Sequence, residues 1–324
     1  MTSLQEVKDK LKGPVFSIIT PFKEDESVDC EALAGYVRFL YDQGAKLFYV
    51  MGYNSRFSLL SEDEIRKVNE VVAITVRSFN DSACVTIVAD PLHCSTATSI
   101  KFAEHAKEVG ADLISLIFKE KVYFEDQVYN HYKRVSENSP VGILVHQMPL
   151  NNGIPGKPPL IRWSSSLTDR VAELPNVVAI KEDTKSDAYT QQMIDILEDR
   201  LAIITSGNGM KQWLNFKGRL HGWLSGVGGF CPQAEIQFFN AFNEGDHKKC
   251  DQILEDVEFP FNKIKNDYGW HLGIKSALEA AGIMSRFERM PLLQLPDSQH
   301  AIVVELMDVI LEKASNYTKA DNGD

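Results

Sequence analysis

Short apolar runs alternate along the chain with longer segments in which apolar residues recur at the period of a helix. The expected strands are Val15–Thr20, Leu47–Met51, Val85–Ala89, Leu113–Ile117, Gly142–His146, Val177–Lys181, Ala202–Thr205 and Gly222–Ser225. The helices expected between them are Cys30–Tyr41, Glu62–Val76, Ser95–Val109, Gln127–Glu137, Leu160–Leu174, Asp187–Leu197 and Met210–Phe216. Because parallel strands need crossover helices, this alternation predicts an α/β fold with a parallel sheet. The count of eight favours a closed (β/α)8 TIM barrel.

The strand signal ends near Pro232, and only helical patterns follow. The expected helices there are Glu235–Phe242, His247–Val257, Ile274–Ala281 and His300–Ala314. We therefore expect a catalytic barrel over residues 1–231 and a C-terminal helical extension over residues 232–324. The sequence does not indicate a dinucleotide-binding fold, because the GxGxxG motif typical of that fold does not follow the first strand.

The charge of the chain excludes some classes of partner. Its 324 residues carry 34 basic and 45 acidic side chains, which give a net charge of −11. Such a surface repels phosphate backbones and anionic lipids, so we expect neither nucleic acid nor membrane as a partner. An acidic small-molecule substrate remains compatible with this charge, because a cleft can be positive while the whole protein is acidic.

The cysteines and the N-terminal segment indicate a cytoplasmic protein without a metal site. The five cysteines are widely spaced, and none has the spacing of zinc ligands. The segment from Met1 to Lys12 is polar and has no apolar core typical of a signal peptide. No apolar run approaches the roughly 18 residues that a membrane span requires.

Lys181 ends one of the expected strands and is the first candidate for chemistry. Alternation along Asn176–Lys181 predicts that Val177, Ala179 and Lys181 share one face. If that face is the barrel interior, the amine lies at the C-terminal end of the barrel, where active sites of this fold gather. Burial there would lower the pKa of the amine and supply a neutral nucleophile. The alternative is a solvent-facing lysine just beyond a strand.

Several segments, taken in order, resemble one family over nearly the whole chain. They are Ile19-Thr20-Pro21-Phe22-Lys23, Val178-Ala179-Ile180-Lys181-Glu182, Gly222-Trp223-Leu224-Ser225-Gly226 and Lys275-Ser276-Ala277-Leu278-Glu279. Together they resemble the dihydrodipicolinate synthase / N-acetylneuraminate lyase superfamily, as a divergent member. The resemblance implies that Lys181 forms a Schiff base with a 2-oxo acid. It also implies a homodimer or homotetramer and no organic or metal cofactor.

The chain departs from this family where the substrate carboxylate is held. The family has Gly-Thr-Thr-Gly-Glu after its second strand, whereas this chain has Gly52-Tyr53-Asn54-Ser55-Arg56. Asn54 and Ser55 can still donate hydrogen bonds, and Arg56 could hold a carboxylate through two of them. Arg56 could equally pair with Glu62 or Asp63. Ser206 and Gly207, after the seventh strand, are further candidates for binding substrate oxygens.

A histidine replaces the tyrosine that the family uses to move protons. This chain has His146-Gln147-Met148-Pro149 where the family has Tyr-Asn-x-Pro. An imidazole both accepts and donates a proton near neutral pH, so His146 is the expected proton shuttle. Tyr53 and Tyr49 are alternative shuttles, and His146 could instead be a packed structural residue.

Other departures argue against dihydrodipicolinate synthase activity itself. Asn151 stands where the synthases carry an arginine, and Phe118-Lys119-Glu120 replaces their Pro-Tyr-Tyr, with Tyr123 off register. The acidic residues typical of sialic-acid lyases are replaced by Gly209-Met210. We therefore expect an aldolase or dehydratase acting on a 2-keto-3-deoxy sugar acid or a related compound. Two alternatives stay open: a binding or regulatory protein without turnover, and a decarboxylase or hydratase that uses His146 without an imine.

Overall fold

The computed structural model describes residues 3–92, 94–117, 124–147, 150–151, 160–161, 163–197, 199–206 and 209–317. Its centre is one sheet of parallel strands in the order β1-β11-β10-β9-β6-β5-β4-β3-β2. The strands are β1 (Gly13–Pro14), β2 (Phe16–Ser17), β3 (Leu47–Tyr49), β4 (Val85–Ala89), β5 (Leu113–Ile117), β6 (Gly142–Gln147), β9 (Val177–Glu182), β10 (Ala202–Ser206) and β11 (Gly222–Leu224). β1 and β2 are separated only by Val15. Since β1 pairs with β11 and β2 with β3, the sheet closes into the expected barrel.

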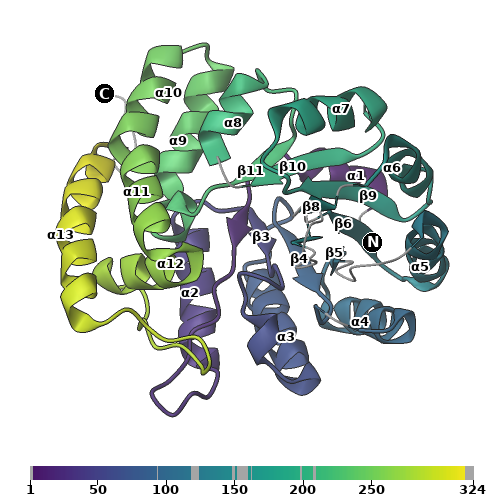
Figure 1. The fold of residues 1–324 in the computed structure, drawn as a ribbon, viewed down its shortest axis with the longest axis horizontal. Helices are drawn as coiled ribbons and strands as arrows, with labels where there is room; N and C mark the ends of the chain where they lie inside the picture. The colour runs from purple at the N-terminus through teal and green to yellow at the C-terminus, as the bar shows by residue number, and fades with distance from the viewer. Residues whose placement is uncertain are drawn as a thin grey trace.

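Helices follow the strands and form the outer layer (Figure 1). They are α2 (Cys30–Asp42), α3 (Glu62–Ser78), α4 (Thr96–Val109), α5 (Glu125–Asn138), α6 (Ser165–Ala172), α7 (Asp187–Leu197), α8 (Gly209–Asn215) and α9 (Pro232–Asn243). The start of α3 is a capping box, in which the side chains of Ser61 and Glu64 each accept a hydrogen bond from the other residue's backbone N–H. Ser95 caps α4 by accepting a hydrogen bond from the N–H of Thr98.

The inside of the barrel is filled by side chains and closed at one end by a short helix. Helix α1 (Leu4–Lys10) was not expected from the sequence, because its polar surface hides the helical period. Val7 of α1 and Leu11 pack in one cluster with strand residues such as Leu47, Leu144 and Ile204. A second, larger cluster lies between the sheet and the helices.

A β-bulge corrects the expected alternation along β9. Ile143 pairs with Val177, but the next residue, Leu144, pairs with Ala179. Val178 is thus the extra residue of the bulge and packs with Ala179 inside the barrel, whereas Val177 belongs to the outer cluster. The prediction that Val177 shares the inner face was wrong. Ala179 and Lys181 do share that face.

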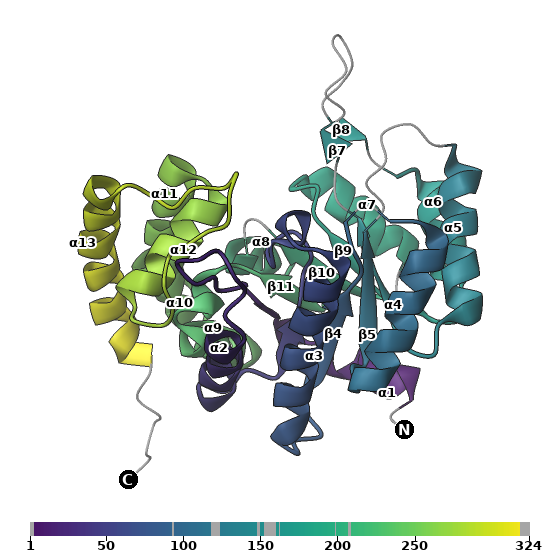
Figure 2. The same ribbon diagram turned by 90° about the horizontal axis from the view of Figure 1, so that it is seen from below.

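The connection after β6 also differs from the expectation. A helix was expected from Leu160, but Leu150–Asn151 (β7) and Leu160–Ile161 (β8) form an antiparallel pair. Helix α6 begins only at Ser165, because Ser164 accepts a hydrogen bond from the N–H of Leu167 and caps the helix there. The β7–β8 pair projects from the end of the barrel opposite α1 (Figure 2).

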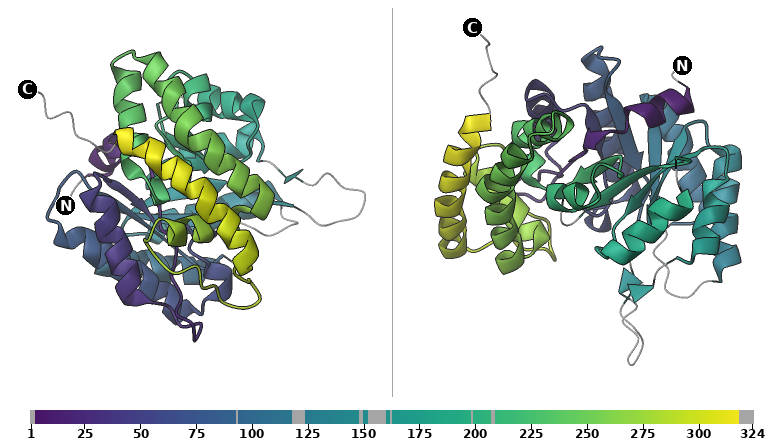
Figure 3. Two further views of the ribbon diagram at one scale, coloured as in Figure 1. Left: turned by 90° about the vertical axis from the view of Figure 1, so that its left-hand side faces the viewer. Right: turned by 90° about the horizontal axis from the view of Figure 1, so that it is seen from above.

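The C-terminal helices gather on one side of the barrel, with α13 outermost (Figures 2 and 3). They are α10 (His247–Ile253), a π-helical turn (Leu254–Glu258), α11 (Phe259–Tyr268), α12 (Trp270–Ala280) and α13 (Asp297–Ala314). Helix α11 was not expected from the sequence. Helix α9 follows β11 and packs against β1, so it completes the eighth strand–helix unit. We propose that the boundary between barrel and extension, expected after residue 231, lies after α9. No helix among the described residues is long and apolar enough to cross a membrane.

Candidate active site

The strand register brings Lys181 and His146 side by side at the C-terminal end of the barrel. His146 near the end of β6 pairs with Lys181 on β9, and Ile204 on β10 pairs with the same lysine on its other side. The carboxyl ends of parallel strands meet at one edge, so neighbouring strands present their last inward-facing side chains to a common site. The structure therefore brings together two of the residues that the sequence proposed for chemistry.

The amine of Lys181 has three polar side-chain partners. Its Nζ lies 3.1 Å from Nε2 of His146 and donates to Oδ2 of Asp183 at 2.8 Å and to Oγ of Ser206 at 3.1 Å. Ser206 in turn donates to the other carboxylate oxygen of Asp183. Lys181 has no exposed surface. A neighbouring group therefore has to move before a substrate carbon can bond to Nζ.

Burial and charge act in opposite directions on this cluster. Burial lowers the pKa of Lys181, while the negative charge of Asp183 works against that shift. Burial alone would raise the pKa of Asp183, but the charge of Lys181 and the contact with His146 outweigh it and hold that pKa well below its usual range. Asp183 is therefore an anion at working pH, beside an amine that loses its proton more readily than an exposed lysine.

Asp183 is the functional candidate that the sequence analysis missed. It lies one residue beyond β9, and its Oδ2 is also 3.5 Å from Nε2 of His146. Strand alternation puts residues i and i+2 on the same face, so Asp183 follows Lys181 to the same side. That alternation was the available signal, and it was overlooked because the expected strand stopped at Lys181.

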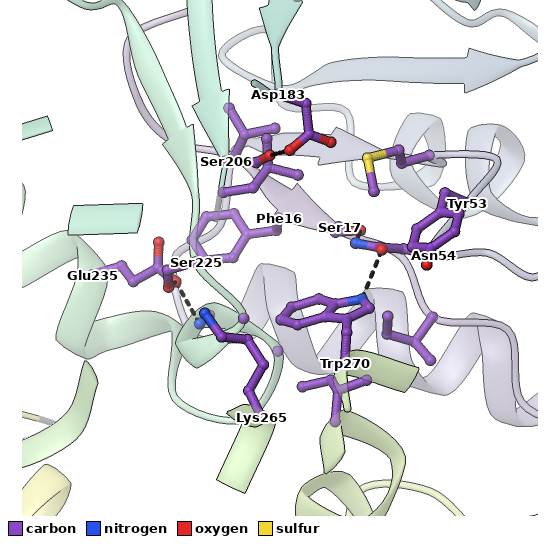
Figure 4. Close-up of a pocket in the computed structure, with 18 of the residues that line it drawn as sticks. Phe16, Ser17, Tyr53, Asn54, Asp183, Ser206, Ser225, Glu235, Lys265 and Trp270 are labelled. Atoms are coloured by element: carbon purple, nitrogen blue, oxygen red, sulfur yellow. Dashed lines mark hydrogen bonds between the residues drawn. The ribbon is translucent and has the colours of Figure 1, made fainter. Parts of the chain in front are cut away.

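A pocket of about 190 Å³ adjoins this cluster. Asp183 and Ser206 line it, so two of the three partners of Lys181 face the pocket, although Lys181 itself does not. Its other walls come from the first strand, the segment after β3, the segment after β11, and helices α11 and α12 (Figure 4). The pocket thus lies between the mouth of the barrel and the C-terminal helices.

The segment Gly52–Arg56 contributes to this pocket only in part. Tyr53 and Asn54 line it, whereas Gly52, Ser55 and Arg56 do not. Asn54 is held in place, since its amide donates to Ser17 Oγ at 2.7 Å and its carbonyl accepts from Trp270 Nε1 at 2.8 Å. The hydroxyl of Ser55 is buried and donates to the carbonyl of Ile18 at 2.7 Å.

Both expectations for Arg56 were wrong. Its guanidinium is buried and pairs with Glu288, a residue of the C-terminal extension, with Nη2 2.6 Å from Oε1 and Nε 3.1 Å from both carboxylate oxygens. Nη1 donates to the carbonyl of Asn54 at 2.7 Å and Nη2 to that of His271 at 3.2 Å. With its guanidinium held by Glu288 and two backbone carbonyls, Arg56 neither lines the pocket nor pairs with Glu62 or Asp63. A partner so distant in sequence leaves no local signal.

The remaining site predictions have mixed outcomes. Tyr49 points into the barrel, where its hydroxyl lies 2.7 Å from Ser115 Oγ and burial raises its pKa. Tyr53 is partly exposed, and its ring lies 4.6 Å from that of His271. Gly207, Met148 and Pro149 lie outside the described residues, as do Phe118-Lys119-Glu120 and Tyr123. Among the described residues no group of His, Cys, Asp or Glu side chains could hold a metal ion, and the five cysteines are free.

Known proteins resemble this chain along most of its length. It is 26% identical to a 4-hydroxy-tetrahydrodipicolinate synthase of Psychrobacter arcticus, over 93% of this chain and 96% of that protein. It is also 26% identical to a DapA-like lyase of Pyrococcus horikoshii that is described as uncharacterized, over 88% of this chain and 94% of that protein.

Solved structures share the fold. The dihydrodipicolinate synthase of Oceanobacillus iheyensis superposes with a TM-score of 0.81 at 19% identity, over 94% of this chain and 98% of that one. The enzyme of Acinetobacter baumannii, solved with pyruvate, superposes with a TM-score of 0.79 at 22% identity, over 93% and 99% of the two chains. The sequence model of the dihydrodipicolinate synthetase family matches residues 10–309. With its barrel, its strand-end lysine and this match over nearly its whole length, the chain belongs to the dihydrodipicolinate synthetase family.

Proposed function

We propose that this lyase forms an imine between Lys181 and a 2-oxo acid. The observation that carries the proposal is the amine of Lys181, fully buried at the end of β9 and in contact with His146, Asp183 and Ser206. A neutral amine is needed to attack a carbonyl, and burial lowers the pKa of this lysine. The family relationship adds support, since the related enzyme of Acinetobacter baumannii was solved with pyruvate.

The first step is attack of Lys181 Nζ on C2 of the substrate. The C2 oxygen must gain two protons to leave as water, and the nitrogen must lose protons as the imine forms. Nε2 of His146, 3.1 Å from Nζ, is placed to accept a proton from the nitrogen and return it to the departing oxygen. His146 is thus the proposed shuttle, and Tyr53, which lines the same pocket, is the alternative.

Asp183 and Ser206 stabilise the charge that this chemistry creates. A protonated imine carries a positive charge at the nitrogen that Asp183 Oδ2 now contacts at 2.8 Å. A carboxylate fixed in a site shielded from water stabilises that charge far more than one in solution. Ser206 holds the carboxylate in place by donating to its second oxygen.

The protonated imine then acts as the electron sink. In an aldolase the C3–C4 bond breaks, its electrons form the enamine, and the proton of the C4 hydroxyl is removed as the aldehyde leaves. In a dehydratase a proton leaves C3 and the hydroxide at C4 departs with a proton as water. His146 supplies or accepts these protons in either case. The imine does the work that a metal ion performs in metal-dependent aldolases, so the proposal needs no cofactor.

Substrate oxygens are proposed to bind to Ser206, Gly207 and the segment from Gly52 to Ser55. Tyr53 and Asn54 are the side chains of that segment that face the pocket. Gly52 and Ser55 do not line the pocket, and the N–H and hydroxyl of Ser55 are already bound to Met51 and Ile18, so Tyr53 and Asn54 carry the proposed contacts of this segment. We propose a 2-keto-3-deoxy sugar acid or a related 2-oxo acid as substrate, since Asn151 stands where synthases carry an arginine. As in the family, we propose a cytoplasmic homodimer or homotetramer.

Borohydride reduction with a panel of 2-oxo acids tests the proposal. An imine is reduced to a stable secondary amine, so mass spectrometry should find the added mass on the peptide that contains Lys181. Trapping together with release of an aldehyde or formation of a dehydrated product identifies the lyase. Trapping without turnover of any compound points instead to a binding or regulatory protein. Turnover without trapping points to a decarboxylase or hydratase that uses His146 directly.

A further inference from the structure

A row of buried polar side chains lies directly behind the active-site residues. Gln147 of β6, Glu182 of β9 and Thr205 of β10 are paired in the strand register, and each is at most 1% exposed. Each is next in sequence to Lys181 or to a residue that contacts its amine. Because successive side chains of a strand point to opposite faces, this row faces the outer helices. Glu182 is the charged member of the row.

The carboxylate of Glu182 is bound to the chain that follows its strand. One oxygen accepts a hydrogen bond from the N–H of Thr184, and the other accepts one from the hydroxyl of Thr190 on α7. Nε2 of Gln212 on α8 donates to the same hydroxyl at 3.4 Å. The ion pairs at this strand end are made by Asp183, so Glu182 relies on its hydrogen bonds, which an ionised acceptor makes strong.

These bonds fix the short connection between β9 and α7, which begins with Asp183. The N–H of Asp183 donates to the carbonyl of Gln147 at 3.2 Å, and the next N–H, that of Thr184, is held by Glu182. Lys185 follows with φ 56°, a left-handed conformation that is costly for a residue other than glycine and persists only where its surroundings impose it. Asp183 therefore leaves the strand between two fixed N–H groups.

We propose that Glu182 is a positioning residue that acts through Asp183. By tying the connection to α7, it keeps Oδ2 of Asp183 at 2.8 Å from Nζ of Lys181. It also keeps the other oxygen of Asp183 in contact with Ser206 (Figure 4). A carboxylate held in this place stabilises a cationic imine without having to be ordered first. Thr190 then contributes from an outer helix, although it does not line the pocket.

Thr190 offers a test that leaves every group of the active site in place and is milder than Glu182→Ala, which would open a buried cavity. Thr190→Val removes the hydroxyl at nearly constant volume, and Thr190→Ser restores it. Turnover should fall about 3- to 10-fold in Thr190→Val, as the loss of one hydrogen bond predicts, and recover in Thr190→Ser. Thr168→Val on α6 is the matched control and should turn over like the wild type. Thr168 is equally buried, and its hydroxyl has no hydrogen-bond partner among the described residues.

The pKa of Lys181 separates positioning from a general loss of stability. Burial lowers this pKa, the negative charges of Asp183 and Glu182 raise it, and the positive charge of Lys185 lowers it. His146 contacts the same amine and is unchanged in every variant. Displacement of Asp183 should therefore lower the pKa of Lys181 further. An NMR titration of isotope-labelled lysine measures it without substrate, and the signal missing in Lys181→Ala assigns it.

The expected result is a lower pKa of Lys181 in Thr190→Val and a wild-type pKa in Thr190→Ser and Thr168→Val. Adding Thr190→Val to Asp183→Asn should lower it no further, because the effect passes through the Asp183 carboxylate. An unchanged pKa in Thr190→Val, or an equal decrease in the Asp183→Asn background, overturns the role of Glu182. The effect on turnover rests on the proposed imine chemistry, but the titration does not. A lower pKa in Thr190→Val without trapping of any 2-oxo acid supports the positioning role and rejects the imine.

Discussion

Oδ2 of Asp183 accepts a hydrogen bond at 2.8 Å from Nζ of Lys181, two residues earlier in the chain. Lys181 is fully buried and the side chain of Asp183 is 13% exposed, so the carboxylate acts on the lysine through a medium that screens charge weakly. Asp183 favours the ammonium form of Lys181 before the reaction and the cationic imine after it. One carboxylate thus works against the first step and in favour of the later ones.

Replacing Asp183 by Asn should separate these two effects. Without the negative charge, the pKa of Lys181 falls further, so the neutral amine is present at lower pH. The acid limb of the pH–rate profile should therefore shift to lower pH. The maximum rate should fall by about 10²-fold, because the cationic imine loses its counter-charge. Asp308→Asn, on the exposed surface of α13, should change neither quantity. An acid limb that shifts to higher pH would contradict the role given to Asp183.

Lys181→Ala should abolish both borohydride trapping and turnover, because Lys181 carries the buried amine that contacts His146, Asp183 and Ser206. Circular dichroism should show the fold intact. The exposed Lys101→Ala on α4 serves as the control and should be trapped like the wild type. Covalent trapping that persists in Lys181→Ala would remove this lysine from the mechanism.

His146→Phe should leave the imine detectable but slow turnover by about 10²- to 10⁴-fold, the usual contribution of a positioned acid or base. Steady-state rates measured across pH should lose one ionisation that the wild type shows. His247→Phe, exposed at the start of α10, is the control. If the pH profile of His146→Phe keeps that ionisation, the shuttle is another group, and Tyr53→Phe becomes the next variant to measure.

Local patterns in the sequence predicted the elements of the barrel well where the buried side chains follow the apolar period of the element. The bounds of β4, β5 and α7 agree with the expectation residue for residue, because each has a clear apolar period and definite turn residues at its ends. Helix α1 was missed, since it packs by only a few apolar side chains against the end of the barrel. Helix α11 was missed because the π-helical turn Leu254–Glu258 shifts the period before it.

The candidate site was predictable only where it depends on neighbouring strands. Lys181 and His146 could be placed together because strand ends converge in this fold. Arg56 could not be placed, because its partner Glu288 lies 232 residues later and no periodicity connects them. The same holds for Lys265 and Trp270, which reach the pocket from helices that the sequence presented only as an appendage.

The pair between Arg56 and Glu288 connects the segment after β3 to the C-terminal extension, and this connection can be measured. Both side chains are almost fully buried, and Arg56 also holds the carbonyl of His271, next to the pocket residue Trp270. Removing one partner leaves the other charge buried and unpaired, so Arg56→Ala should lower the free energy of unfolding by about 3–5 kcal/mol. The double variant Arg56→Met with Glu288→Met should lose less free energy of unfolding than the two single variants added together, because it leaves no isolated charge. Denaturant unfolding measures these differences.

Arg219→Ala is the control: it breaks an exposed pair with Asp195 and should lower the free energy of unfolding by less than about 1 kcal/mol. If Arg56→Lys raised KM without changing the free energy of unfolding, Arg56 would be a substrate contact after all.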